Sequence, residues 1–468
     1  MNTLQKLALR GVLLLVVLFA GTVMASPKIE HWTLDSGLRV FYVGIDDLPM
    51  VDLSLTFDAG SARDGKKNGV AYMTMSMMDK GAAGMDANKL AEVFENVGAN
   101  FYTDASRDMV SIGLRTITLE APFKSAVDNW LAVIKTPEFP QADFERLQKQ
   151  MKVGFEADKQ NPGSVAGKAF YKHLYGDHPY ANPTEGFEDT VAAMKTADLK
   201  AFYRRYIVEE NAMLTITGDM TRKEAEVLAK RVAEVLPAGK KPEPIPAVKP
   251  LTEAKTVHIP FPSSQAHILI GQPGYKRGDK DYFKLYLANH PFGGSGFTSR
   301  LMKEIRVKRG LSYSVYSHFS PLRELGAFTM GMQTKLDQID EGKQALCELL
   351  DNYLKDGATA QEIEESKLNI TGGFPMSIAG NSNIGNYVEM IGFYGMPLDY
   401  LERFTHNINA VTQAQAREAM QRRIKPDAML TVIVGGEAKN DPQNDAEAPV
   451  DKGAEAHETR KVDTATGG

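Results

Sequence analysis

The chain has 468 residues, of which 43% are hydrophobic and 24% charged, and its formal net charge is −5. This composition is typical of a globular protein with two or more hydrophobic cores, and the mild acidity argues against a nucleic acid as partner. Because Cys347 is the only cysteine, an internal disulfide and a cysteine-based metal site are both excluded.

Residues 1–25 have the pattern of a signal peptide. Lys6 and Arg10 supply a positive start, residues 11–23 form an apolar run, and small residues follow at a cleavage position. An apolar run this short favours a cleaved export signal over a permanent membrane anchor. We therefore expect an exported, periplasmic protein that keeps no stable membrane span after cleavage.

The first half of the chain is predicted to hold strands followed by helices. Residues 29–43 alternate around Asp35-Ser36-Gly37 and indicate a β-hairpin, and residues 51–60 follow as a strand. Further segments have helical or strand patterns: helices at 68–80, 86–97, 122–136 and 140–160, and paired strands within 101–115. Strands and helices that arrive in separate runs predict an α+β fold with mainly antiparallel sheets packed by helices.

A proline-rich segment divides the chain, and the two halves end alike. Residues 237–250, with five prolines, are typical of a semi-rigid linker between domains at 26–236 and 251–436. NAMLTITGD (211–219) and DAMLTVIVGG (427–436) are both strand-like, and each follows a helical segment that carries a double arginine. This repetition predicts two homologous domains. The acidic residues 437–468 lack large apolar side chains and are predicted to be disordered.

The helix predicted at 68–80 has two different faces. Val70, Met73 and Met77 form one apolar stripe, whereas Tyr72 and Ser76 stack one turn apart on another face, beside Met75. Ordinary core packing by methionine explains the first stripe. It gives no role to the second face.

The surroundings of this helix resemble a known family. The order of hairpin, strand, DAGSARDGKKNGVA (58–71), helix and HPYANPTEGFED (178–189) resembles the insulinase/pitrilysin/mitochondrial-processing-peptidase family of zinc metallopeptidases, over residues 29–436. In catalytic members of that family the helix carries H-x-x-E-H, in which two histidines bind zinc and the glutamate acts as general base. A glutamate further along the chain is the third ligand.

The resemblance places the zinc-site positions on residues that cannot bind zinc well. The two histidines fall on Tyr72 and Ser76, the general base on Met75 and the third ligand on Val153, which is placed by counting and by the nearby KQNP (159–162). Because all four positions have lost their chemistry, the resemblance implies a degenerate subunit with no metal on this chain.

A second group of residues keeps the family's pattern. SRLMKEIRVKRGLSYSV (299–315) resembles the segment in which the family places an arginine and a tyrosine seven residues apart, here Arg306 and Tyr313. The resemblance implies that these side chains reach a peptide held at the zinc of the other half, where donors stabilise the oxyanion. A surface arginine and a strand tyrosine without function remain the alternative.

Two weaker patterns do not change this interpretation. The glycine-rich stretch FGGSGFTSRL (292–301) lacks the lysine of a phosphate-binding loop, so a tight turn before a helix is the better prediction. His173 and His178 lie near each other in the sequence, but a glycine between them suggests a loop rather than a metal site.

The resemblance implies a subunit of a two-chain peptidase. This chain would form half of a clamshell with a homologous, zinc-bearing partner, contribute Arg306 and Tyr313 to peptide hydrolysis, and be inactive alone. Two other functions stay open: a non-catalytic, chaperone-like module that binds exported peptides, and a structural scaffold subunit. A neighbouring gene for a homologue with an intact H-x-x-E-H motif would favour the peptidase pair.

Overall fold

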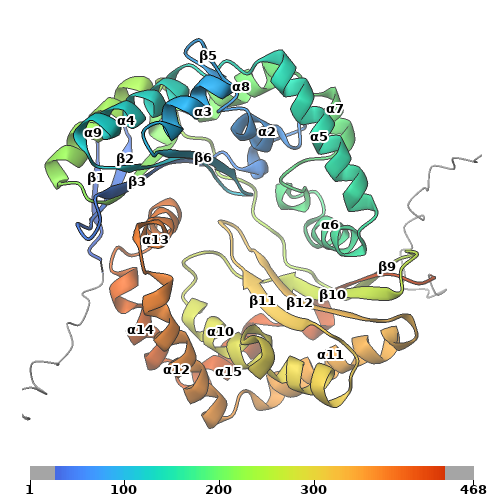
Figure 1. Ribbon diagram of the computed structural model, residues 1–468. Helices are drawn as coiled ribbons and strands as arrows, with labels where there is room; N and C mark the ends of the chain where they lie inside the picture. Colours follow the sequence, from blue (N-terminus) through green and yellow to red (C-terminus); the bar gives the residue numbers. More distant parts are fainter. Residues whose placement is uncertain (1–26, 438–468) are drawn as a thin grey trace, which may run out of the picture.

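The computed structural model describes residues 27–437, arranged around two β-sheets (Figure 1). The predicted signal peptide and all but the first residue of the predicted acidic tail lie outside the described residues. Within residues 27–437 no helix is both long enough and apolar enough to cross a bilayer.

The first sheet has six strands in the order β1-β2-β8-β3-β7-β6. The predicted hairpin is confirmed: β1 and β2 pair antiparallel, and Gly37 makes the turn with a positive φ of 89°. The strands are β1 Glu30–Thr33, β2 Arg39–Gly44, β3 Met50–Phe57, β6 Asn100–Ala105, β7 Val110–Ile117 and β8 Ala212–Gly218. A separate two-stranded hairpin consists of β4 Gly81–Ala82 and β5 Met85–Asp86.

Seven helices of the first half belong to the layer that accompanies this sheet (Figure 1). They are α2 Val70–Ser76, α3 Ala87–Glu95, α4 Glu120–Lys135, α5 Gln141–Lys159, α7 Glu188–Ala193, α8 Thr196–Tyr206 and α9 Arg222–Val235. Buried side chains of α4, headed by Trp130, and of α2 join those of the strands in one hydrophobic core. The strand and helix runs predicted from the sequence are therefore confirmed in this half.

The second sheet has five strands in the order β11-β12-β10-β13-β9. The strands are β9 Lys255–Ile259, β10 Gln265–Pro273, β11 Val315–Ser320, β12 Ala327–Lys335 and β13 Leu430–Val434. This half also contains the helices α10 Tyr282–Asn289, α11 Ile339–Asp356, α12 Ala360–Ser377, α14 Tyr400–Ala410 and α15 Gln413–Arg423.

The two sheets have the same topology. The order β9-β13-β10-β12-β11 repeats the order β2-β8-β3-β7-β6, strand for strand. In each sheet the strand with the AMLT sequence, β8 or β13, is parallel to one neighbour and antiparallel to the other. The expected α+β fold with two homologous halves is confirmed.

Each half contributes one helix to the sheet of the other half. Helix α6 (Pro162–Tyr175) packs against β10 and β13, whereas α13 (Asn381–Tyr394) packs against β8 and β3 (Figure 1). Phe170 of α6 shares a core with Val432, and Val388 of α13 shares a core with Met213. Neither sheet is therefore covered by its own half alone.

A buried carboxylate joins the halves at one point. Asp108, in the turn between β6 and β7, is only 2% exposed and accepts hydrogen bonds from the Tyr180 hydroxyl, the Tyr394 hydroxyl (3.0 Å) and the Arg323 backbone N–H (2.7 Å). Tyr394 belongs to α13 and Arg323 to the β11–β12 loop, so two of the three donors come from the second half. Asp108 therefore links the two halves by direct hydrogen bonds.

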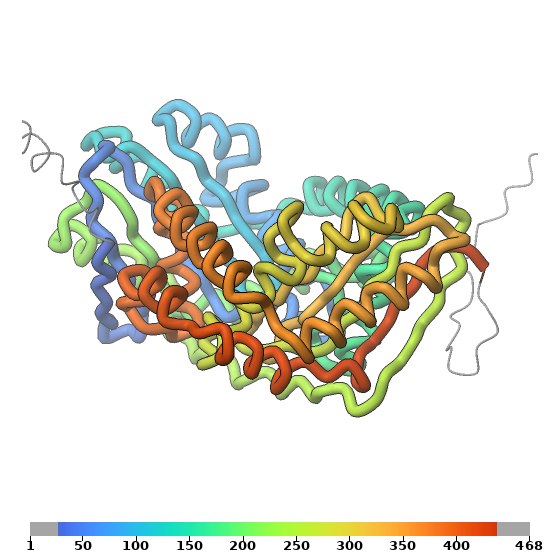
Figure 2. Tube along the Cα trace, turned by 90° about the horizontal axis from the view of Figure 1, so that it is seen from below, coloured from blue at the N-terminus to red at the C-terminus, as the bar shows by residue number. Residues whose placement is uncertain are grey.

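Residues 237–254 contain no helix or strand and connect the halves (Figure 2). This segment, yellow-green in Figure 2, runs along one edge of the molecule. Ile245 and Val248 are buried against α6 and the second sheet, and the Pro246 carbonyl lies 2.9 Å from His178 Nε2. The predicted linker is therefore an extended segment that packs on the body of the protein.

Candidate functional site

The N-terminus of α2 is held by a buried carboxylate. Asp64 accepts hydrogen bonds from the backbone N–H groups of Gly69 (2.7 Å) and Ala71 (3.0 Å). Burial raises the pKa of Asp64 to about 7, although both hydrogen bonds oppose this shift. Gly69 begins the helix with a φ of 94°, and a Cβ there would lie 2.5 Å from the Glu185 carbonyl oxygen. Only glycine fits this turn without strain.

Helix α2 carries three of the four positions that the resemblance assigns to zinc and its base. It ends at Ser76, earlier than the predicted 68–80, and the chain continues in turns toward β4. Tyr72 and Ser76 are half-buried on one face, whereas Met75 is 2% exposed and receives a hydrogen bond on its carbonyl from Thr103 Oγ1 (3.0 Å). The two faces predicted for this helix are thus present.

The fourth position lies on a different helix. Val153 belongs to α5 and is 70% exposed. The KQNP sequence that follows ends α5 and begins α6, where Asn161 Oδ1 caps the new helix by accepting from Gly163 N and Ser164 N. The KQNP sequence thus has a structural role in this chain, at the junction of two helices.

These four residues do not fit a zinc ion. Zinc sites in proteins use histidine nitrogen, cysteine sulfur and carboxylate oxygen, whereas Tyr72 and Ser76 offer hydroxyl groups and Val153 offers no ligand atom. Met75 is an uncharged thioether and cannot act as a base. No cluster of three or more histidine, cysteine, aspartate or glutamate side chains in residues 27–437 is placed to hold a metal ion. The described residues offer no basis for a zinc-dependent step on this chain.

The second predicted pair is brought together. Arg306 lies in the π-helical segment Met302–Lys308, and its Cζ is 4.4 Å from the centre of the Tyr313 ring. Tyr313 is 77% exposed and precedes β11, so it lies outside the strand that the alternative interpretation required. An exposed phenol beside a guanidinium provides two hydrogen-bond donors to a ligand.

Sequence reasoning missed a third member of this group. Phe297 is 73% exposed and its ring centre lies 5.0 Å from Arg306 Cζ, on a different segment from Tyr313. It belongs to the glycine-rich stretch 292–301, which forms the π-helical His290–Gly294 and the 3-10 turn Gly296–Thr298 before the next helical segment. A large aromatic residue in a glycine-rich turn is the only signal that could have singled it out.

Of the two remaining histidine candidates, His178 has a structural role. His178 accepts a hydrogen bond on Nδ1 from the Tyr180 backbone N–H, and its Nε2 lies against the Pro246 carbonyl. His173 lies near the end of α6, and the predicted loop at Gly176 separates it from His178. The His178 side chain therefore lies against the linker.

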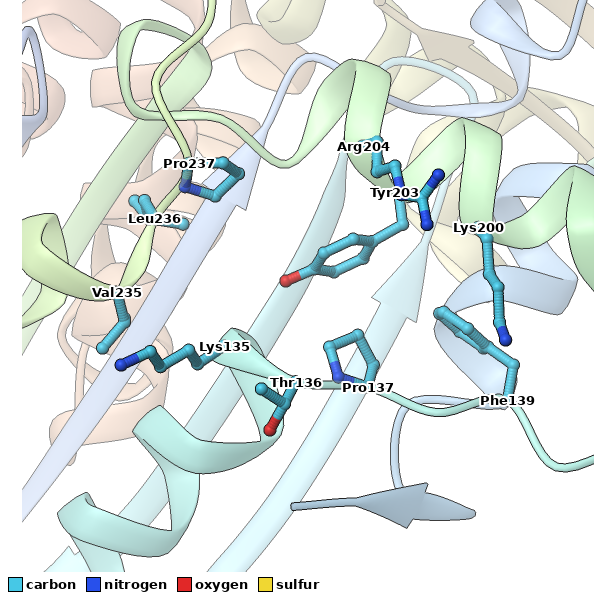
Figure 3. Close-up of a pocket in the computed structure, with 10 residues that line it drawn as sticks. All are labelled: Lys135, Thr136, Pro137, Phe139, Lys200, Tyr203, Arg204, Val235, Leu236 and Pro237. Atoms are coloured by element: carbon cyan, nitrogen blue, oxygen red, sulfur yellow. The ribbon is translucent and has the colours of Figure 1, made fainter. Parts of the chain in front are cut away.

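A separate pocket lies between α4, α8 and α9, in the first half (Figure 3). It has a volume of about 410 Å³ and is floored by Phe139, Tyr203 and Leu236. The Tyr203 hydroxyl donates to the Ile134 carbonyl, and burial raises its pKa, so it stays protonated. The pocket contains none of the predicted site residues.

Comparison with known proteins gives two matching family models. Residues 43–187 match the model described as Insulinase (Peptidase family M16), and residues 193–370 match the Peptidase M16 inactive domain. The structure is similar to that of a peptidase M16 inactive domain from Pseudomonas fluorescens, with 36% identity, 88% of this chain and 100% of that chain covered, and a TM-score of 0.85.

Two Helicobacter pylori comparisons extend the likeness. A protease of known structure shares the fold, with a TM-score of 0.81 at 18% identity over 88% of this chain and all of its own. The protein named non-peptidase homolog YmxG is 24% identical over 436 residues, which cover 91% of this chain and 99% of that protein. The uncharacterized zinc protease YmxG of Bacillus subtilis is 23% identical over 86% of this chain and 98% of its own.

Proposed function

The chain belongs to peptidase family M16, in which it is an inactive homologue, and we propose that it completes the active site of a zinc-bearing homologue. In this proposal the two chains form a heterodimer, each supplying half of a clamshell around a peptide. The partner supplies the zinc and the general base. This chain supplies Arg306 and Tyr313.

The observation that carries the proposal is the exposed Arg306–Tyr313 pair. Arg306 Cζ lies 4.4 Å from the centre of the Tyr313 ring, and the two residues belong to different segments. Tyr313 is 77% exposed, which is unfavourable for an aromatic ring that has no ligand. A pair of donors held together on an open surface is suited to a ligand from outside the chain. The four positions on α2 and α5 have no side chains that can bind zinc or act as a base. This supports the view that the ligand, a peptide, would be cleaved at the zinc of the partner.

The chemistry of peptide hydrolysis gives each group a defined task. Attack on the peptide carbonyl builds negative charge on oxygen, and a phenol O–H aimed at that oxygen lowers the barrier. A guanidinium has a planar set of N–H donors that can hold a carbonyl or a carboxylate in one orientation. Tyr313 would therefore act on the oxyanion, and Arg306 would position the peptide.

The proposed compartment is the periplasm, and the proposed substrates are exported peptides. Both rest on the export signal predicted for residues 1–25. The second candidate function is a peptide-binding or chaperone-like module without cleavage, or a scaffold subunit. It is favoured by the resemblance to a protein named as a non-peptidase homologue. If the same organism has no zinc-bearing homologue, this second function becomes the better proposal.

The deciding experiment measures turnover by the assembled pair. Tyr313→Phe removes only a hydroxyl from an exposed ring, so folding and assembly should survive while turnover falls about a hundredfold. Arg306→Lys keeps the charge but loses the planar donor set, so it should raise the apparent KM. Assembly is checked by size-exclusion chromatography.

The matched control is Tyr286→Phe, which alters another partly exposed tyrosine on α10. This variant should leave turnover per assembled complex unchanged. If Tyr313→Phe behaves like the control, the proposed catalytic role is wrong and the binding or scaffold function takes its place.

A further inference from the structure

Arg306 lies over the faces of two exposed aromatic rings. Its Cζ is 5.0 Å from the centre of Phe297 and 4.4 Å from the centre of Tyr313. The three residues come from three consecutive segments: the turn Gly296–Thr298, the helical segment Met302–Lys308 and the loop before β11. Gly296 has a φ of 59°, and this left-handed turn presents Phe297 to solvent.

Three cations near Arg306 are already paired, but Arg306 is not. Arg300 pairs with Glu362 (2.6 Å), Lys308 with Glu304 (2.6 Å) and Arg309 with Glu348 (3.7 Å). In residues 27–437 the side chain of Arg306 has neither an ion pair nor a hydrogen-bond acceptor, and Lys303 likewise has no carboxylate partner. This surface therefore carries an excess of positive charge with unused N–H donors.

Aromatic neighbours change how a guanidinium binds. The negative faces of the rings hold the cation in place and restrict its rotamers without using its N–H groups. A carboxylate matches the free donors because it can accept two parallel hydrogen bonds from a guanidinium. An ordered side chain loses less entropy when it binds, so the two rings favour such a contact.

From this geometry we infer that Phe297, Arg306 and Tyr313 form a receptor for a peptide carboxylate. Arg306 contacts the carboxylate, the Tyr313 ring lies against Arg306 and leaves its hydroxyl for the oxyanion, and Phe297 acts as a positioning residue that fixes Arg306. The inference rests on the proposed function in one respect, that a peptide reaches this surface. It adds a preference for a class of substrate, peptides with a carboxylate at the position next to Arg306.

The carboxylate has two sources, the C-terminus of a peptide and an aspartate or glutamate side chain. Three N-acetylated peptides of otherwise equal sequence separate them: a free C-terminal acid, its amide, and an amide with one internal glutamate. Binding to the full chain without any partner is measured by isothermal titration calorimetry. The free acid, the glutamate peptide or both should bind about tenfold more tightly than the plain amide, and this difference should shrink at high salt.

Variants of Phe297 test the positioning role. Phe297→Ala should weaken the carboxylate preference about two- to fivefold, the effect of losing one exposed cation–π contact. Phe297→Tyr should restore the preference, and Phe297→Leu, which keeps apolar bulk without a ring face, should not. Leu368→Ala is the matched control, because Leu368 is equally exposed on α12 and lies on a different segment.

A spectroscopic signal distinguishes positioning from general damage. The Arg306 Nε–H resonance, assigned with Arg306→Lys in a 15N-arginine-labelled sample, should be shifted by the ring currents of both aromatic neighbours. Phe297→Ala should move it toward the position of a solvated arginine, whereas Leu368→Ala should not.

The outcomes separate this inference from the proposed function. If none of the acidic peptides binds more tightly than the amide, or if Phe297→Ala behaves like the control, the carboxylate receptor is wrong. That result leaves the effect of Tyr313→Phe on turnover untouched. If the acidic peptides bind as expected while Tyr313→Phe turns over normally in the pair, the receptor stands and the peptidase role fails.

Discussion

Replacing Asp108 by asparagine should destabilise the protein by about 2–4 kcal/mol. The carboxylate is buried and accepts from the Tyr180 and Tyr394 hydroxyls and from the Arg323 backbone N–H. An asparagine keeps only one acceptor oxygen and turns an N–H group toward donors on the other side. Each buried donor left without an acceptor costs about 1–3 kcal/mol, and bonds to a charged acceptor lie at the upper end.

The loss of stability can be assigned to the three donors separately. Tyr180 Oη also accepts a hydrogen bond from the Glu324 backbone N–H (3.1 Å), which fixes the position of the hydroxyl. The Tyr180 hydroxyl therefore cannot move to a new acceptor without losing this second bond. The Arg323 N–H cannot be moved without moving the β11–β12 loop. Tyr394→Phe removes one donor and leaves Asp108 with two others, so it should cost only about 1 kcal/mol.

Urea denaturation measures these effects with two probes. Trp32 and Trp130 both belong to the first half and report on it by fluorescence, whereas far-ultraviolet circular dichroism reports on both halves. Asp108→Asn should lower the midpoint of the transition. Because two of its donors come from the second half, the two probes should also cease to coincide.

Asp47→Asn is the matched control for Asp108→Asn. Asp47 lies on the exposed β2–β3 loop, and the substitution makes the same change in charge. It should change the free energy of unfolding by less than about 0.5 kcal/mol. If Asp108→Asn costs no more than the control, Asp108 does not hold the halves together and the reasoning from its three donors fails.

Three further predictions concern zinc, pH and helix α6, which packs on the sheet of the other half. Metal analysis after dialysis should find no stoichiometric zinc on the purified chain, and one tightly held zinc per chain would contradict the assignment of Tyr72, Met75, Ser76 and Val153. Because burial raises the pKa of Asp64 to about 7 from an ordinary 3.8, its contribution to stability is complete below about pH 4 and is lost as the pH rises through 7. At about 1.4 kcal/mol per pKa unit, this loss amounts to up to about 4 kcal/mol, and Asp64→Asn should abolish it. If the free energy of unfolding depends on pH in the same way in both proteins, this prediction is wrong. Phe170→Ala, which empties a fully buried site between α6 and the second sheet, should cost about 3–5 kcal/mol in thermal or urea unfolding, and a loss below about 1 kcal/mol would show that α6 does not complete this sheet.

Local sequence patterns predicted most elements of the first half. The alternation around Gly37 predicted the hairpin, and the repeated AMLT sequence predicted two equivalent strands, because both signals act over a few residues. The length of α2 was overestimated. Its apolar spacing continues to Met77 and Met78, but these buried side chains belong to turns whose shape is set by packing against the core.

Long-range contacts were outside the reach of such patterns. No helix or strand was predicted for residues 162–175, and a local pattern there would not tell which sheet α6 covers. The pairing of Arg306 with Tyr313 came from the family resemblance. Phe297 had only the weak signal of an aromatic residue in a glycine-rich turn, and Asp108 had none, because their roles arise only when separate segments meet.

Helices α6 and α13 each pack on the sheet of the other half, and this arrangement suggests how such a chain could arise. A single half with this topology would leave one sheet face open, and the helix that could close it would belong to another copy of itself. Two such copies would close each other's sheets around a twofold axis. Fusion of the two genes through a segment such as residues 237–254 would preserve that dimer interface inside one polypeptide, where each copy becomes free to lose or keep different residues.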